Sequence, residues 1–187
     1  MKKYLKKILY SLRPFFRLVL SLFFDKKYLV GRHFDDDIKG YVFAFRSVWQ
    51  KNILRLSPPL PWPTVLTCLI SKADNITFHP DDLNNFQSPG TYFQNFEGKI
   101  SIGRGTYIAP NVGIITVNHK IHDLDQHEDG QDVSIGEKCW IGMNSVVLPG
   151  VVLGDGTIVG AGSVVTKSFP EGHQLLGGIP ARVLKVY

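Results

Sequence analysis

Apolar residues recur every six positions through the second half of this 187-residue chain. Nine sites follow this spacing, in two runs: Ile102, Ile108 and Ile114, then Ile135, Ile141, Val147, Leu153, Val159 and Val165. Gly or Ala follows six of the nine sites, and a small or β-branched residue stands four positions after seven of them. A repeat of six exceeds one strand alternation and does not fit the helical period of about 3.6 residues. The spacing predicts a chain that turns a corner every six residues, which is a parallel β-helix.

Three such hexads make one triangular coil, so about 18 residues per turn are expected, with strands stacked about 4.8 Å apart. The apolar residue of each hexad is predicted to point inward, and the Gly after it to lie at a corner. Extrapolating the phase backwards places Asn84 and Gly90 at inward sites of a degenerate capping coil between Phe78 and Phe96. Cys139 falls on a small-residue position, which predicts a buried, reduced thiol.

The repeat is interrupted once. After Ile114 the next good inward site is Ile135, so residues 120–134 form an excursion loop of fifteen extra residues. This loop is polar, with five acidic residues and two histidines, and Asn118 and His119 stand directly before it. Long polar loops on a compact scaffold commonly carry function, so the excursion is the first candidate for a site.

Positive charge is concentrated at the N-terminus. The formal net charge is +5, but residues 1–32 hold nine Lys/Arg and one Asp, about +8, which leaves about −3 for the remainder. This distribution argues against nucleic-acid binding by the main domain. Residues 2–27 predict a basic amphipathic helix, bent at Pro14, with charged and apolar stripes on opposite sides. The charged stripe is Lys2, Lys6, Arg13 and Arg17, and the apolar stripe is Leu5, Ile8, Leu9, Leu12, Phe16, Val19 and Phe23.

The longest uncharged stretch of this arm, residues 18–24, is much shorter than the roughly 20 residues of a membrane span. It also lacks the cleavage pattern of a secretory signal. We therefore expect residues 1–27 to make a peripheral membrane contact, with packing on the protein's own oligomer as the alternative. Residues 33–75 predict a connecting region, with a second short helix that begins near residues 35–37 and a proline-rich break, SPPLPWPT.

The second half resembles the hexapeptide-repeat acyltransferases. The stretches that carry the resemblance are IITVNHKIHDLDQ, VSIGEKCWIGMNSVVLPGVVLGDGTIVGAGSVVTKSFP and LLGGIPARVLK, which are similar to the maltose, galactoside and polysaccharide O-acetyltransferases. The resemblance covers roughly residues 76–187. It implies a left-handed parallel β-helix, an acyl-CoA donor that is usually acetyl-CoA, and a homotrimer with active sites between subunits.

The expected fold is therefore mainly β, a left-handed parallel β-helix with a helical N-terminal extension. Residues 1–32 are assigned to the basic amphipathic helix and residues 33–75 to the connecting region. Residues 76–170 are assigned to the β-helix, and residues 171–187 to a short C-terminal segment.

Motif matching assigns His119 as the general base. An imidazole, whose ordinary pKa is near neutrality, can take the proton of a sugar hydroxyl as that hydroxyl attacks a thioester. A backbone N–H in the Gly142–Met143 corner is expected to stabilise the oxyanion. Met143 departs from the Ser that is common in sugar acetyltransferases. The residues implied to line the CoA groove are Trp140, Gly142, Met143, Ala161, Thr166, Lys167, Arg182 and Lys185, and those implied to orient the acceptor or the histidine are Asn111 and Asn118.

The expected function is acetyl-CoA-dependent O-acetylation of a saccharide, a cell-envelope polysaccharide or its precursor. The enzyme is expected to be cytoplasmic and peripheral on the inner membrane face, because the basic arm suits a lipid-linked acceptor. Serine, a free sugar or an antibiotic are the alternative, small soluble acceptors. No metal is required by this interpretation.

Two other classes remain as alternatives. His122 and His127 are five residues apart, like a ligand pair of the γ-type carbonic anhydrases, which are zinc enzymes on the same fold. A third protein ligand is needed, and in the upstream coil from which that family takes it this chain offers only His79, in the degenerate segment. The remaining class is a non-catalytic β-helix that serves as a scaffold.

Overall fold

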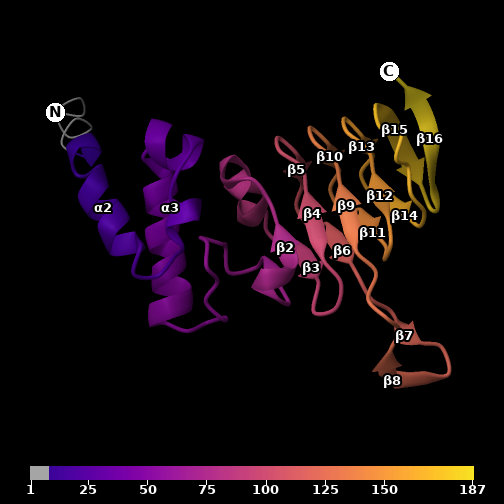
Figure 1. The fold of residues 1–187 in the computed structure, drawn as a ribbon, viewed down its shortest axis with the longest axis horizontal. Helices are drawn as coiled ribbons and strands as arrows, with labels where there is room; N and C mark the ends of the chain where they lie inside the picture. The colour runs from indigo at the N-terminus through magenta and orange to yellow at the C-terminus, as the bar shows by residue number, and fades with distance from the viewer. Residues whose placement is uncertain (1–8) are drawn as a thin grey trace. The chain divides into compact units, whose positions relative to one another are not determined.

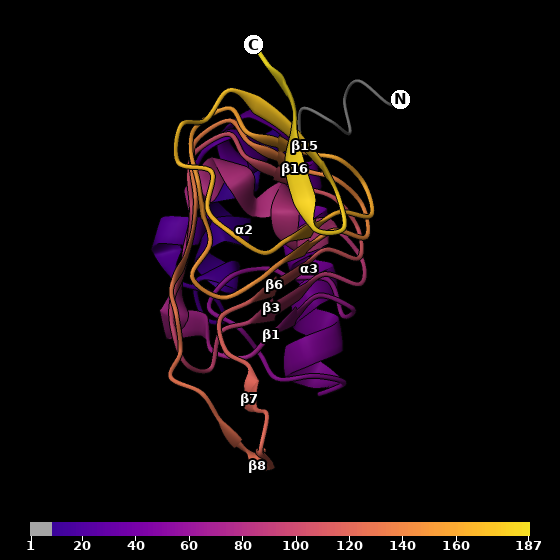
Figure 2. The same cartoon turned by 90° about the vertical axis from the view of Figure 1, so that its right-hand side faces the viewer.

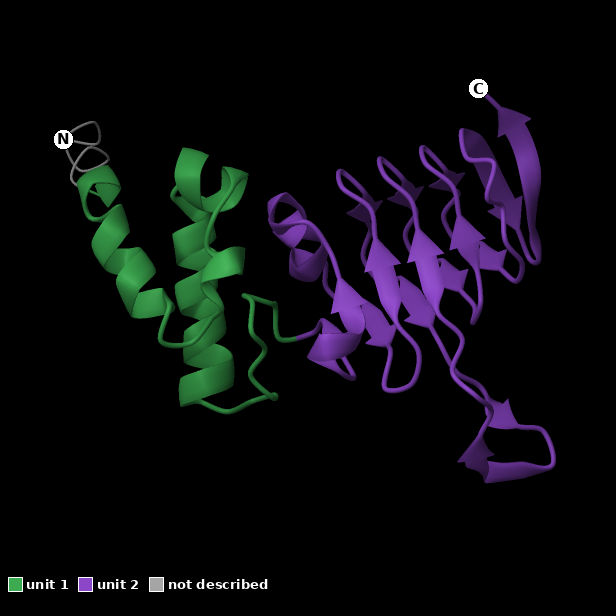
Figure 3. Ribbon diagram, viewed as in Figure 1, with its two compact units in different colours: residues 1–66 green, residues 67–187 purple. Residues whose placement is uncertain are grey.

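The computed structural model describes residues 9–187, which fall into two compact units, residues up to 66 and residues 67–187 (Figure 3). The first part of the helix predicted over residues 2–27, with Lys2, Leu5, Lys6 and Ile8, lies outside the described residues. No helix in the described part of the chain is long and apolar enough to cross a membrane.

The second unit is a parallel β-helix with three faces (Figures 1 and 2). The first face contains β1 (Leu69–Ile70), β3 (Tyr92–Gln94), β6 (Gly113–Ile115), β11 (Val146–Val147) and β14 (Val164–Val165). The second contains β2 (Ile76–Thr77), β4 (Ile100–Ile102), β9 (Val133–Ile135) and β12 (Val152–Leu153). The third contains β5 (Tyr107–Ile108), β10 (Trp140–Ile141), β13 (Ile158–Val159), β15 (Gln174–Gly178) and β16 (Ala181–Val186). Within the faces all pairs are parallel except β15 with β16.

Strand register confirms the six-residue phase. Leu153 pairs with Ile135, 18 residues earlier, and the same interval separates the paired Val159 and Ile141. These four side chains are at most 2% exposed, so they form the inward columns that the sequence predicts. Ile141 also pairs with Ile108, 33 residues earlier, because the fifteen excursion residues are added to one coil. Fully burying each such side chain contributes about 1.5–3 kcal/mol.

The first coil departs from the extrapolated phase. Phe93 occupies the inward site, since it pairs with Ile114 and is 1% exposed. Gly90 is exposed, with φ +73° at a turn, and Asn84 is only half-buried. A 3₁₀ helix, η5 (Pro80–Gln87), replaces the strand of this coil, and the residues that it buries most deeply are Asp82, Leu83, Asn85 and Phe86. The predicted inward positions of Asn84 and Gly90 are therefore wrong, because the helix breaks the six-residue count.

Cys139 is buried, as predicted, and in the described chain it forms no disulfide. Burial raises the pKa of the Cys139 thiol. A protonated thiol is a poor nucleophile, so iodoacetamide at about pH 8 should leave Cys139 unmodified in the folded protein and label it after unfolding in urea. Peptide mapping by mass spectrometry distinguishes Cys139 from Cys68. Rapid labelling of Cys139 without denaturant would contradict its burial.

The same pKa shift has a consequence for stability. The folded state holds the Cys139 proton more tightly than the unfolded state does. The contribution of this thiol to the free energy of unfolding is therefore fully present below the pKa of the thiol in the unfolded chain. It is lost as the pH rises through the folded pKa. The thiol therefore destabilises the folded chain only in alkaline solution.

The first unit is helical. Its α-helices are α2 (Arg13–Leu20) and α3 (Lys39–Ser47), and α3 continues as the π-helix η3 (Val48–Ile53). Shorter helical turns are η1 (Lys26–Tyr28) and η2 (Arg32–Asp36), and η4 (Ala73–Asn75) belongs to the β-helical unit. Residues 9–11 are helical and a turn at Leu12 separates them from α2, so the predicted bend lies just before Pro14. The predicted second helix is confirmed as α3, and the Asp37 carboxylate accepts the N–H of Ile38 at its start, at 2.6 Å.

The basic side of α2 faces its own unit. Arg17 Nη2 lies 2.5 Å from Asp35 Oδ1, and Arg13 Nη1 donates to the Asp35 carbonyl at 2.7 Å. The hydrogen bond from Arg17 lowers the pKa of Asp35. On the opposite side Phe15, Leu18 and Leu22 are 59–77% exposed. These three apolar side chains are exposed, whereas Phe16 packs against the rings of Tyr41 and Phe45 and Leu20 is fully buried.

Candidate functional site

The excursion forms a β-hairpin that projects from the β-helix (Figures 1 and 2). In this hairpin β7 (His119–Lys120) pairs antiparallel with β8 (Asp123–His127). Its polar side chains bond to one another, since Lys120 Nζ donates to Gln126 Oε1 at 2.9 Å and Gln126 Nε2 donates to Asp123 Oδ2 at 2.8 Å. The sequence predicted a polar excursion here, and the hydrogen-bonded strands give that excursion a defined shape.

His119 stands at the first position of β7 and is exposed. Its Nδ1 lies 2.7 Å from the Leu124 carbonyl oxygen. A carbonyl oxygen only accepts hydrogen bonds, so Nδ1 carries the hydrogen and donates it. In the neutral ring Nε2 is then the nitrogen with an available lone pair. The backbone of β8 thus selects the tautomer in which Nε2 accepts hydrogen bonds.

A second ring packs against the His119 imidazole. The His119 and His127 rings lie 4.5 Å apart between centroids and are inclined by 39°, and the Phe96 ring meets His127 edge-on at 5.0 Å. Phe96, His127 and the Leu124 carbonyl were not predicted to support His119. A backbone carbonyl leaves no signature in a sequence, and the pairing of His119 with His127 appears only once the hairpin register is known.

A second group of predicted residues lies at the corner between the third and first faces. Met143 and Ala161 follow β10 and β13 and lie in register with Pro110, which follows β5, and Asn111 is the next residue along from Pro110. The stack is hydrogen-bonded, because Gly162 N–H donates to the Met143 carbonyl at 2.8 Å and Asn144 N–H to the Pro110 carbonyl at 3.2 Å. All three predicted side chains are at least partly solvent-accessible.

Gly142 serves the packing of this corner. Its N–H donates to the Val159 carbonyl at 2.8 Å. A Cβ at Gly142 would meet Ala161 N and Val159 O at 2.6 Å, so only Gly allows the coils to approach this closely. Of the two N–H groups predicted for the oxyanion, that of Gly142 is therefore committed to the stack, and that of Met143 is the remaining candidate.

The other predicted residues lie elsewhere on the β-helix. Thr166 and Lys167 follow β14 on the first face, the face from which β6 leads into the hairpin, and Lys167 Nζ lies 5.6 Å from the Phe169 ring. On the third face Trp140 is 54% exposed and lies between Tyr107 and Ile158. Arg182 and Lys185 are on the exposed edge strand β16.

Asn118 and His119 thus follow β6, and Thr166 and Lys167 follow β14 on the same face, with β11 between the two strands. Asn111, Met143 and Ala161 gather at the corner between the third and first faces, and Trp140, Arg182 and Lys185 lie on the third face.

The described residues contain no cluster of ligands of the kind that the zinc alternative requires. Among residues 9–187 no group of three or more His, Cys, Asp or Glu side chains is placed to hold a metal ion. His127 packs between His119 and Phe96, and His79 Nδ1 accepts the backbone N–H of Asp81 at 3.1 Å.

Known proteins share this repeat. Residues 132–167 match the family described as bacterial transferase hexapeptide (six repeats). The galactoside O-acetyltransferase of Escherichia coli K12 is 37% identical over 90 residues, which cover 46% of this chain and 43% of that protein. The putative lipopolysaccharide biosynthesis O-acetyl transferase of the same strain is 37% identical over 103 residues, covering 47% of this chain and 50% of that protein. The chain therefore spans about half the length of the curated relatives that it matches.

A solved structure extends the likeness to almost the whole chain. The maltose O-acetyltransferase of Clostridium difficile 630 superimposes with a TM-score of 0.53 at 25% identity, over 96% of this chain and 88% of that one. The predicted resemblance and fold class are confirmed. The second unit of this chain is a left-handed parallel β-helix, and its residues 132–167 are similar to the hexapeptide-repeat transferases of bacteria.

Proposed function

We propose that the chain is an acetyl-CoA-dependent O-acetyltransferase that acts on a saccharide hydroxyl, with His119 as the general base. The observation that carries the proposal is the hydrogen bond between His119 Nδ1 and the Leu124 carbonyl, which leaves Nε2 to accept a proton. The similarity of the repeat to galactoside and maltose O-acetyltransferases supports the class of reaction.

The reaction needs one proton acceptor and no covalent enzyme intermediate. His119 Nε2 takes the proton of the acceptor hydroxyl while its oxygen attacks the thioester carbonyl carbon. The C–S bond then breaks, and the imidazolium returns the proton to the leaving thiolate, so that the histidine is regenerated neutral. The Met143 N–H is our candidate for stabilising the oxyanion that forms between these steps.

We assign the acyl-CoA donor to the corner residues and the third face. Lys167, Arg182 and Lys185 offer cations for the nucleotide phosphates. Trp140, half of whose surface is exposed, offers a flat apolar face. Asn111 and Asn118 remain our candidates for orienting the acceptor, because both side chains are exposed close to the two corners.

The division of these residues between corners supports a homotrimer. A single β-helix holds His119 at one corner and Met143 at another, so one copy does not gather the whole set. In an assembly with threefold symmetry, the hairpin corner of one subunit can face the Met143 corner of the next. Active sites would then lie between subunits.

For the acceptor we propose a saccharide of the cell envelope or its precursor. The similarity to a putative lipopolysaccharide biosynthesis O-acetyl transferase supports this choice. The basic N-terminal arm supports a peripheral position on the inner membrane face through residues 1–27. A small soluble acceptor is the alternative.

The test is a CoA-release assay with purified full-length protein and acetyl-CoA. The acceptors are galactosides, maltose, serine and envelope saccharide extracts. We expect CoA to be released with a saccharide and not with serine, with mass spectrometry showing one added acetyl group on the acceptor. Turnover of serine alone would overturn the saccharide assignment, and no turnover with any acceptor would count against the transferase itself.

A further inference from the structure

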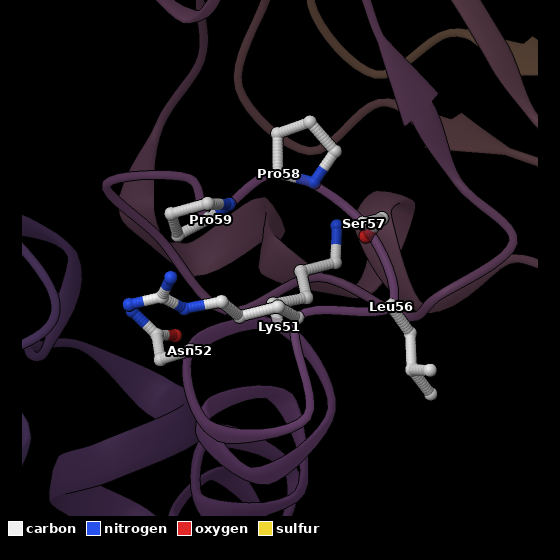
Figure 4. A pocket seen from close by; sticks show the side chains of 7 residues that line it. Lys51, Asn52, Leu56, Ser57, Pro58 and Pro59 are labelled. Carbon is white, nitrogen blue, oxygen red and sulfur yellow. The ribbon is translucent and has the colours of Figure 1, made fainter.

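The helical unit contains a cavity of about 660 Å³ at the end of η3 (Figure 4). Two oxygens of its lining, Asn52 Oδ1 and Ser57 Oγ, make no hydrogen bond within the described residues, but they are inaccessible to solvent and therefore to a ligand. The cavity thus gives no sign of a binding site. The hairpin of the second unit offers a further functional residue in His127, which packs between Phe96 and the imidazole of His119.

The base of the hairpin is tied to the β-helix. Gln94, at the end of β3, accepts the N–H groups of Thr116 and Val117 with Oε1, at 3.2 Å each, and donates from Nε2 to the Val117 carbonyl at 3.1 Å. The returning chain closes the base, because the N–H of Gln131 donates to the Thr116 carbonyl at 2.7 Å. These bonds fix the points at which the chain leaves the β-helix and returns to it, but they end before His119 is reached.

Beyond its base the hairpin projects into solvent, except at one side chain. Residues 118–126 and 128–132 are all exposed, whereas His127 is half-buried. The ring of His127 meets the Phe96 ring edge-on, with the two centroids 5.0 Å apart, and Phe96 follows β3 in the preceding coil. His127 is therefore the side chain that anchors the projecting strands to the β-helix.

The ring of His127 also lies against His119. The two residues are directly paired across β7 and β8, so their side chains share one face of the hairpin. Their ring centroids are 4.5 Å apart and the rings are inclined by 39°, a separation typical of attractive aromatic contacts. The β-helix thus reaches the His119 imidazole through two ring contacts in series, from Phe96 to His127 and from His127 to His119.

His119 is held by two different constraints. The hydrogen bond between Nδ1 and the Leu124 carbonyl orients the ring relative to the hairpin itself. It does not orient the hairpin relative to the β-helix, because Leu124 is exposed on the projecting strand β8. The contact of His127 with Phe96 supplies this second constraint. In the proposed reaction the donor lies against the β-helix, so the position of Nε2 relative to the β-helix decides how well it meets the acceptor hydroxyl.

We propose that His127 is a positioning residue of the acetyltransferase, which holds the imidazole of His119 at a fixed place relative to the β-helix through its contact with Phe96. This inference rests on the proposed function of His119 and adds a residue to it. His127 takes no proton from the acceptor. Its role depends on the shape of the ring, so an aromatic residue without ring nitrogens should serve in its place. A displacement of about 1 Å can lower a catalytic rate about 100-fold, so loss of the contact is expected to appear in kcat.

The kinetic test is steady-state CoA release by full-length variants with a saturating saccharide acceptor. His127→Ala removes both ring contacts and is expected to lower kcat about 10–100-fold, with the KM for acetyl-CoA unchanged. His127→Phe keeps the ring and should restore kcat to within about threefold of the parent. Phe96→Ala should also lower kcat. Because Phe96 acts on His119 only through His127, the double variant should be no slower than His127→Ala alone.

The outcomes separate positioning from other roles. Unchanged kcat in His127→Ala would overturn the proposal, as would a His127→Phe variant as slow as His127→Ala, since the ring nitrogens would then be needed. Additive losses in the double variant would show that Phe96 acts independently of His127, which would also overturn it. The matched control is His122→Ala, which removes an exposed histidine of the same hairpin, and an equal loss there would count against a specific role for His127. Circular dichroism checks the fold.

A spectroscopic readout does not depend on turnover. Nuclear Overhauser contacts are expected between the ring protons of His119 and His127 in the parent, and Phe96→Ala should weaken them. Absence of these contacts in the parent would overturn the inference. The two proposals fail in different ways: no turnover by the parent counts against the transferase, whereas turnover that His127→Ala leaves intact counts against this inference alone.

Discussion

Replacing His119 with alanine is expected to lower kcat for acetyl transfer by about 10²–10⁴-fold, the usual contribution of a general base. The substitution removes the nitrogen that accepts the hydroxyl proton, and the KM for acetyl-CoA should change little. The backbone pairing of β7 with β8 does not depend on the side chain, so the hairpin should keep its fold. Steady-state CoA release with a saturating saccharide acceptor measures the effect.

Two matched variants test the role of His119. In His119→Asn the side-chain amide can still donate to the Leu124 carbonyl, but it has no basic nitrogen, so activity should be as low as in the alanine variant. His122→Ala removes another exposed histidine of the same hairpin and should leave kcat within about twofold. Recovery of activity in His119→Asn would mean that His119 only shapes the hairpin.

Ile135→Ala is expected to lower the free energy of unfolding by about 2–5 kcal/mol. Ile135 is 2% exposed and lies in register between Ile102 and Leu153, so its removal leaves a cavity that rigid neighbouring coils cannot close. Urea unfolding followed by circular dichroism measures the loss, at one fixed protein concentration because oligomer stability depends on concentration.

The preceding residue provides the control. Ser134 lies on the same strand with its side chain directed away from the core, and its alanine variant should stay within about 0.5 kcal/mol of the parent. A loss below about 1 kcal/mol for Ile135→Ala would contradict the close packing of the column.

The β-helix was predictable because each hexad buries one apolar side chain in the same kind of environment. Sites such as Ile135 and Leu153 face the same column in successive coils, so their spacing reports the fold directly. The prediction failed where repetition ends. In the capping coil, η5 buries Leu83 and Phe86 through a helical turn, and no six-residue rule applies there.

The candidate site was predictable only in part. His119 stood out because it borders the one interruption of the repeat, yet its tautomer depends on the Leu124 carbonyl, a backbone atom common to every residue. The orientation of α2 could not be predicted from the sequence either. Helical periodicity gave the two stripes, but only the contacts with Asp35 show that Arg13 and Arg17 face inward.

The hairpin leaves the β-helix and returns to it without disturbing the register. Ile102 pairs with Ile135 across the fifteen added residues just as Ile135 pairs with Leu153 without them. The entropic cost of closing a loop rises only slowly with its length. The length and sequence of this hairpin can therefore change while the core stays the same, so that this point of the β-helix accepts insertions of other lengths without a change in the packing of the coils.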